Sequence, residues 1–142
     1  MKNANVFALA LLLPLLIFIS NCSPDQYIKP STEDLLTRNG WSVDYYFQQQ
    51  DITGEFGSYR ITFNPSGTIF CRNENEIISG SWNRIVDAGG QKEIISISIN
   101  STNPSINKLN DSWTLVSLTA STISFEDGQF PSNSVLRIRI KQ

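Results

Sequence analysis

Residues 59–72 read YRITFNPSGTIFCR, and this stretch has the clearest pattern of a β-hairpin in the chain. Tyr59, Ile61 and Phe63 alternate with polar side chains, as in a strand that buries one face. Asn-Pro-Ser-Gly follows, with proline and glycine at favoured turn positions, and the chain returns through TIFCR. The stretch therefore predicts two antiparallel strands joined by a tight turn.

The same alternation recurs on both sides of this hairpin, with turn residues between the segments. The strands are short and regular and no crossover helix is expected between them, so the chain predicts an antiparallel, mainly β fold. Sequential pairing gives an eight-stranded up-and-down barrel, which removes the exposed edges of the sheet. A two-sheet β-sandwich stays open as the alternative. The expected strands are residues 41–48, 59–63, 68–72, 78–82, 93–99, 113–118, 122–125 and 134–140.

Residues 31–38 (STEDLLTR) predict one short helix before the first strand. Ser31 or Thr32 caps the helix, and the two acidic residues that follow suit the positive end of its dipole. Asn39-Gly40 predicts a left-handed stop. Residues 100–110 contain a proline and predict a polar loop. The folded domain is expected to cover residues 31–142.

The beginning of the chain has the order of a secretory signal. Residues 9–22 read LALLLPLLIFISNC, and Lys2 supplies a positive charge before them. As a helix, the apolar run reaches about 21 Å, which is short of the roughly 30 Å core of a bilayer. We therefore expect a signal peptide over residues 1–21 and not a transmembrane helix.

The end of this run, Ile19-Ser20-Asn21-Cys22, resembles the lipobox of bacterial lipoproteins. The resemblance implies that the Cys22 thiol carries a diacylglycerol and that Cys22 becomes the first residue after cleavage. Residues 22–30 then form a tether. The expected location is the cell envelope, with the chain lipid-anchored at the outer membrane and the leaflet left open. An ordinary cleaved secretory signal is the alternative.

Composition excludes several classes of function. The chain has 11 basic and 13 acidic residues, which gives no basic surface of the kind that binds nucleic acid. It has no histidine, the commonest general base and metal ligand. No nucleophile, phosphate-loop or zinc motif occurs. We expect no enzyme, no catalytic residues, no metal and no cofactor, and a buried structural thiol at Cys71.

The order of short motifs resembles the small lipocalin-like lipoproteins of the Bacteroidetes. These motifs are Gly40-Trp41 at the first strand, the hairpin at 59–72, Gly80-Ser81-Trp82, an isoleucine-rich strand, Trp113 and the last strand. The resemblance implies a lipocalin-like barrel that is open at one end. It also implies that Trp41 packs at the closed end beneath Arg137 or Arg139.

Seven aromatic residues are expected to point into the barrel. An eight-stranded barrel either fills with side chains or holds one small ligand. One hypothesis is therefore a binding protein for a small apolar or amphipathic ligand, with Tyr45 and Tyr59 as polar handles. The other is a structural or interaction lipoprotein with a packed barrel and a protein partner. In both we expect a monomer that reaches the membrane through its lipid. The ligand-cavity candidates are Trp41, Tyr45, Phe47, Tyr59, Phe63, Trp82 and Trp113.

Overall fold

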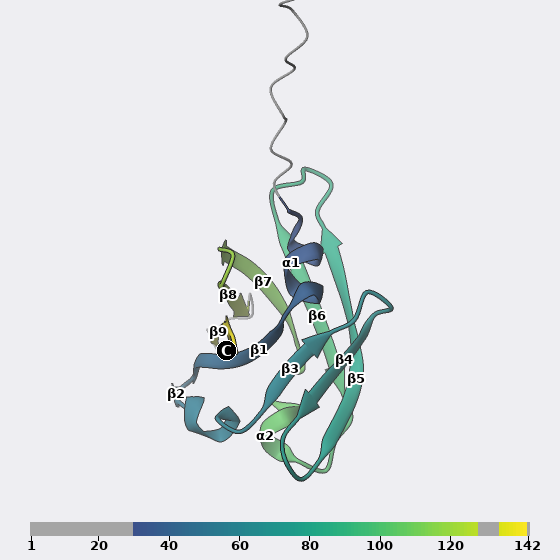
Figure 1. The fold of residues 1–142 in the computed structure, drawn as a ribbon. Coiled ribbons are helices and arrows are strands. Elements are labelled where there is room, and N and C mark those ends of the chain that lie inside the picture. Colours follow the sequence, from purple (N-terminus) through teal and green to yellow (C-terminus); the bar gives the residue numbers. More distant parts are fainter. Residues whose placement is uncertain (1–29, 128–133, 142) are drawn as a thin grey trace, which may run out of the picture.

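The computed structural model describes residues 30–127 and 134–141. The predicted signal peptide, the lipidation site Cys22 and all of the tether except Pro30 lie outside the described residues. The described part holds a short helix followed by a closed antiparallel barrel (Figure 1). The predicted helix, strands and meander are therefore confirmed, and closure excludes the two-sheet sandwich.

Eight strands form the barrel wall in chain order, and β1 pairs with β9 to close it. A two-residue strand, β2, pairs only with the end of β1. The strands are β1 (Gly40–Gln48), β2 (Gln50–Asp51), β3 (Arg60–Phe63), β4 (Thr68–Arg72), β5 (Ile77–Val86), β6 (Glu93–Ile99), β7 (Asp111–Leu118), β8 (Thr122–Asp127) and β9 (Val135–Ile140).

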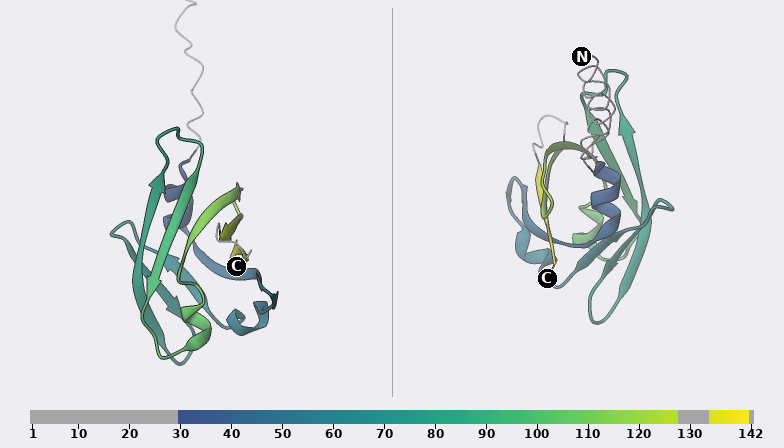
Figure 2. Two further views of the ribbon diagram at one scale, coloured as in Figure 1. Left: turned by 180° about the vertical axis from the view of Figure 1, so that it is seen from behind. Right: turned by 45° about the horizontal axis from the view of Figure 1, so that its top comes forward.

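A short helix lies at each end of the barrel. Figure 2 shows α1 (Thr32–Arg38) across one mouth of the ring, and Figure 1 shows α2 (Pro104–Asn107) at the other. The 3₁₀ helix η2 (Thr53–Phe56) lies beside α2. Leu36 of α1 and Ile106 of α2 are inaccessible to solvent, so both helices are packed into the core.

Local sequence explains both helices. Ser31 caps α1 through a reciprocal capping box with Asp34. Asn103 caps α2, and Pro104 occupies its first turn, where a missing N–H costs no hydrogen bond. The left-handed stop predicted at Asn39-Gly40 is wrong, because Asn39 is extended and the chain passes directly into β1.

The first strand contains a β-bulge that changes which side chains face inward. On β1, Val43 pairs with Ile138 and Tyr45 pairs with Arg137, so Asp44 is an extra residue. Because side chains alternate along a strand, one inserted residue moves every later side chain to the opposite face.

The wall is split near α1. The pairing of β6 with β7 ends at Ile94 and Thr114. Beyond this point β6 still pairs with β5, and β7 still pairs with β8. The β5–β6 hairpin continues past α1 as a two-stranded ribbon, while β7 curves away with β8 (Figures 1 and 2). Helix α1 lies between the two, and we call this the α1 end of the barrel.

Candidate functional site

The inward face of the barrel is the first candidate for a site. Five of the seven aromatic residues predicted to face inward are buried, and their orientation is confirmed. Phe63 and Trp82 meet edge to face, with ring centroids 5.4 Å apart. The buried members of the set are Trp41, Tyr59, Phe63, Trp82 and Trp113.

The orientation predicted for Tyr45 and Phe47 is wrong. Both are only partly buried, whereas Tyr46, which lies between them in the sequence and was not among the inward candidates, is 1% exposed. The bulge at Asp44 causes this change by inserting one residue into the alternation. Inside the barrel, Tyr46 stacks on Phe56, with ring centroids 5.3 Å apart.

The three tryptophans hold the ends of the barrel. The Trp41 indole N–H donates to the carbonyl oxygen of Leu36 in α1, and that of Trp113 donates to Leu109 just after α2. The Trp82 indole donates to Asn64 in the β3–β4 turn. Each N···O distance is 2.9 Å. These donors are therefore used by the fold itself and are not available to orient a ligand.

Tyr59, predicted as a polar handle for a ligand, belongs to a closed network. Its hydroxyl donates to the Glu76 carboxylate, and the Asn103 amide donates to the Tyr59 hydroxyl at 2.7 Å. The hydrogen bond to Glu76 and burial raise the pKa of Tyr59 to about 12. The network joins the residue before β3, the β4–β5 turn and the cap of α2, so it fastens the α2 end of the barrel.

A second set of contacts closes the same end. The Tyr46 hydroxyl donates to the backbone carbonyl of Lys108, and burial raises the pKa of this tyrosine. The Lys108 ammonium lies 2.8 Å from the carboxylate of Glu55. The lipocalin-like resemblance implied a barrel that is open at one end. In the structure both ends of the barrel are covered, one by α1 and the other by α2.

Side chains fill the interior between these ends. A cavity that held a ligand would leave the side chains around it accessible, whereas residues along the axis are inaccessible. Cys71 is among them, as predicted, and burial raises the pKa of its thiol to about 12. Other residues with no exposed surface are Trp41, Phe56, Ile69, Ile95, Ile106, Leu109 and Ile123.

Arg137 and Arg139 do not pack on Trp41, and the arrangement implied by the lipocalin-like resemblance is wrong here. Both arginines lie on the outer face of β9 and bind Asp44, at N···O distances of 2.6 and 3.2 Å. Arg137 also lies over the ring of Tyr45, 5.6 Å from its centroid. Trp41 faces inward, so a side chain on the outer face cannot cover it.

The split wall is the second candidate site. A depression lies between the ribbon, the beginning of α1 and the part of β7 that has left β6. Its floor carries the ion pair of Arg84 with Glu93, 3.0 Å apart, together with Leu115 and Leu118. Val116, which is 55% exposed, lies on its rim. We call this depression the ribbon groove.

Sequence reasoning missed the ribbon groove. Among the described residues, the exposed large apolar side chains are Ile77, Ile85, Val86 and Val116. Three of these four lie at the α1 end, on the ribbon and at a second bulge in β7. The strand expected over residues 78–82 extends over Ile77–Val86 as β5, and no pattern in the sequence indicates that β6 and β7 separate.

Two kinds of feature are absent from the described residues. No helix there is both long and apolar enough to cross a membrane. No three cysteine or acidic side chains in residues 30–127 and 134–141 come close enough together to hold a metal ion.

Comparison with known proteins gives one similar fold. No family model and no curated protein matches the sequence. The structure is similar to the crystal structure of a DUF4847 family protein from Bacteroides vulgatus, with a TM-score of 0.53 and 15% sequence identity. The match covers 77% of this chain and 96% of that protein. At this identity the likeness concerns the fold alone, so lipoprotein and lipocalin character stay predictions.

Proposed function

We propose that this chain is a lipid-anchored docking protein of the cell envelope. In this proposal Cys22 carries the lipid, and the barrel is a solid module that binds a protein partner through the ribbon groove. The partner contributes an extended segment that adds as a strand to the free edge of β7. The observation that carries the proposal is this edge, Leu115–Leu118, which has no strand partner on its β6 side among the described residues.

The filled interior favours docking over ligand transport. A carrier of an apolar ligand needs a concave, largely preformed cavity with a few convergent polar groups. Here the polar groups of Trp41, Tyr46, Tyr59 and Trp113 are bonded to the protein itself. Native mass spectrometry of the purified protein tests this reasoning: a bound mass lost on denaturation would restore the ligand hypothesis.

The chemistry of the groove suits an extended peptide. A strand edge offers unpaired backbone N–H and C=O groups, which a peptide satisfies by β-augmentation. Val116 supplies exposed apolar surface on the rim of the groove. Val86 adds exposed apolar surface on the neighbouring ribbon, where it pairs with Glu93. Arg84 and Glu93 neutralise each other, so the floor favours no strongly charged ligand.

The anchor places this groove near the membrane. Pro30, the first described residue, lines the groove. Residues 23–30 span at most about 29 Å when fully extended, so a lipid on Cys22 keeps the groove within that distance of the bilayer. A partner embedded in the same membrane is therefore the expected source of the strand.

The tip of the ribbon is too polar to enter the bilayer itself. The Asp87 carboxylate accepts backbone N–H groups of Gln91 and Lys92 at 2.8 and 3.0 Å. These bonds hold the pKa of Asp87 below its ordinary value, so the carboxylate stays charged at neutral pH.

Site-specific photo-crosslinking in the native host tests the docking site. A crosslinker at Val116 should give one discrete heavier product, and the same group at Ile77 is the matched control. Ile77 is 58% exposed but starts β5, at the opposite end of the strand from the ribbon. Equal products from both positions, or none from Val116 in membrane-bound protein, would contradict the docking site.

The anchor has its own test. Cys22→Ser should remove the diacylglycerol mass and release the protein from the membrane fraction. If the wild-type protein carries no lipid mass, the anchor is absent.

A further inference from the structure

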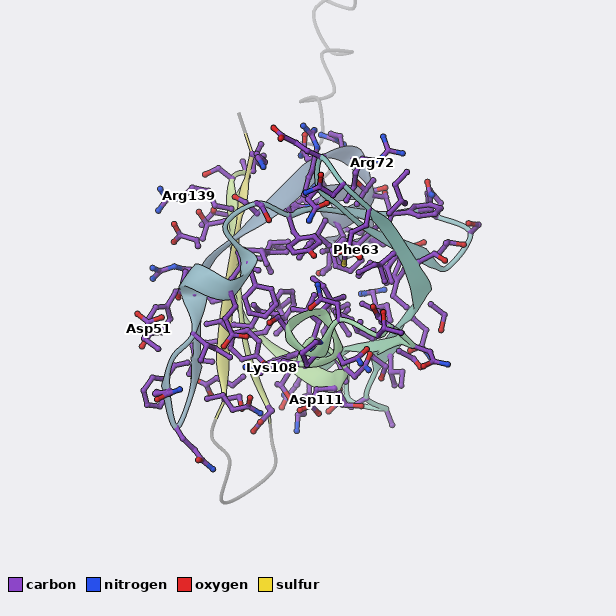
Figure 3. All side chains as sticks on the ribbon, turned by 90° about the horizontal axis from the view of Figure 1, so that it is seen from below. Asp51, Phe63, Arg72, Lys108, Asp111 and Arg139 are labelled. Atoms are coloured by element: carbon purple, nitrogen blue, oxygen red, sulfur yellow. The ribbon has the colours of Figure 1, made fainter. Side chains whose placement is uncertain are left out.

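The outer face of β9 carries a row of cations. Arg137 and Arg139 stand at alternate positions of β9 and share its outer face, while Leu136 and Ile138 are buried. Lys141 follows the end of β9 and lines the same depression as Arg139. Figure 3, seen from the α2 end, shows Arg139 pointing away from the barrel.

Hydroxyl groups flank the middle of this row. Arg139 pairs with Thr122 of β8 on one side and with Ser42 of β1 on the other. Arg139, Thr122 and Ser42 line a shallow depression on the outer face, together with Ser121, Ile140 and Lys141. The Ser42 hydroxyl donates to the Arg139 carbonyl oxygen at 3.4 Å. Two cations and the hydroxyls of Ser121 and Thr122 thus face one hollow, which we call the β9 hollow.

The cations of β9 are only partly neutralised. Asp44 binds both Arg137 and Arg139, so a single carboxylate serves two guanidinium groups. Among the described residues, a second acid on this face, Glu126, pairs with Val135 at the far end of β9. The positive charge therefore increases along β9 towards its C-terminal end, in a chain whose net charge is −2.

This end of β9 lies close to the place where the tether joins the barrel. The backbone N–H of Lys141 donates to the carbonyl of Gly40 at 3.0 Å, and Gly40 follows α1 almost directly. Helix α1 adds about 10 Å between Gly40 and Pro30. The β9 hollow is thus on the same end of the barrel as the predicted anchor.

We propose that the β9 hollow binds the phosphate of an anionic lipid headgroup and orients the anchored barrel on the bilayer. Guanidinium and hydroxyl groups donate hydrogen bonds to phosphate oxygens, and the ammonium of Lys141 adds a point charge. A weak site suffices, because the anchor makes the second contact intramolecular and raises its effective concentration. This inference rests on the proposed function, since an anchored barrel meets the bilayer continuously.

Vesicle co-sedimentation tests the inference on the unlipidated chain from residue 22 carrying Cys22→Ser. That chain retains every described helix and strand, all of which lie within residues 32–140. It should sediment with vesicles that contain phosphatidylglycerol and stay in solution with phosphatidylcholine alone. Half-molar salt should release it, because the contact is electrostatic.

Two double variants that remove the same charge distinguish binding by the β9 hollow from an effect of total charge. Arg139→Gln with Lys141→Gln should weaken vesicle binding about 25-fold, roughly fivefold for each cation. Arg72→Gln with Lys92→Gln should leave it within about twofold. Arg72 lies on β4, which is three strands away from β9 around the barrel. Lys92 lies in the turn between β5 and β6, which are four and three strands away.

Each outcome decides the inference. Equal loss in both double variants, or no loss in the β9 variant, overturns it. Protection of Arg139 and Lys141 signals by inorganic phosphate, without any vesicle binding, would overturn the membrane as the source of the phosphate. The vesicle assay uses unlipidated protein and no partner. A negative vesicle result therefore leaves the Cys22 and Val116 tests unaffected, and negative results in those tests leave the vesicle assay unaffected.

Discussion

The two ends of the barrel are closed by different chemistry. At the α2 end, side chains from four segments form polar links, among them Tyr59 with Glu76 and Lys108 with Glu55. At the α1 end, the helix is held mainly by buried Leu35 and Leu36 and by one bond from the Trp41 indole.

This difference separates a sealed end from an available one. The polar groups of the α2 end are paired with one another, which leaves few of them for a ligand or partner. At the α1 end the wall is split, apolar side chains are exposed and the strand β7 has a free edge. Both proposed binding surfaces, the ribbon groove and the β9 hollow, therefore lie towards the α1 end.

The largest effect is expected from the tryptophan that fastens the sealed end. Trp113 is 1% exposed and packs edge to face on Tyr46, with centroids 5.7 Å apart. Trp113→Ala should lower the free energy of unfolding by about 3–5 kcal/mol, measured by urea denaturation and circular dichroism. Ile77→Ala, at an exposed site, should change it by less than about 0.5 kcal/mol.

Trp113→Phe keeps the comparison testable if the alanine variant does not fold. It retains an aromatic ring but leaves the Leu109 carbonyl without its donor, so we expect a loss of about 1–3 kcal/mol. A phenylalanine variant as stable as the wild type would show that the indole bond does not fasten this end.

The two helix caps offer a matched pair of smaller changes. Asn103→Ala removes the cap of α2 and the amide bonded to Tyr59, so we expect a loss of about 1–2 kcal/mol. Ser31→Ala removes only an exposed cap of α1. We therefore expect it to lower the free energy of unfolding by about 0.5 kcal/mol, the lower end of the range for loss of an N-cap.

Thiol labelling of Cys71 measures both cap variants, because this buried thiol reacts only when the barrel opens. Labelling should accelerate more in the Asn103 variant than in the Ser31 variant. The reverse order would show that the α1 end, and not the α2 end, limits opening.

High pH should weaken the sealed end. The folded-state pKa of Tyr59, about 12, lies above its ordinary value of 10.0. Its contribution to stability is therefore complete below pH 10 and is lost as the pH rises towards 12. The urea concentration at the unfolding midpoint should be lower at pH 11 than at pH 8, and this decrease should be smaller in Tyr59→Phe than in the wild type. Identical slopes would mean that the Glu76 bond does not contribute.

Low pH should loosen the α1 helix by a smaller amount. Hydrogen bonds from the Ser31 side chain and backbone lower the pKa of Asp34 below its ordinary value of 3.8. The stabilisation is present above that value and is lost as the pH falls below it. The protection factors of the α1 amides, which correct for the pH dependence of intrinsic exchange, should fall on acidification in the wild type but not in Asp34→Asn, as measured by NMR. Glu55 titrates in the same direction at the other end, so only α1 amides are informative.

The sequence alone determined the elements that short-range rules control. The hairpin over residues 59–72 depends on a proline and glycine turn, with Gly67 at a φ of 83°. The first helix follows from the capping pair Ser31 and Asp34, three residues apart. Alternation also placed Trp41, Trp82, Trp113 and Cys71 on the inner face.

Tertiary structure decided the features that depend on a neighbouring strand or on distant packing. The bulge at Asp44 exists only in relation to β9, and it exchanged Tyr45 for Tyr46 on the inner face. Helix α2, within a stretch predicted as a loop, is stabilised by burial of Ile106 and by the contact of Asn103 with Tyr59. Four helical residues are too few to form a stable helix by themselves.

The candidate sites divide in the same way. Residue types predicted a lipid anchor at Cys22 and aromatic side chains inside a barrel, because those patterns are local. Whether the barrel is full, and where its wall separates, depends on how side chains far apart in sequence share one volume. The ribbon groove arises because the pairing of β6 with β7 stops at Ile94 and Thr114. The β9 hollow arises because three neighbouring strands bring Thr122, Arg139 and Ser42 into one row. Register between strands is a property of the closed barrel, so alternation within a single strand determines which face a residue takes but not which neighbours it meets.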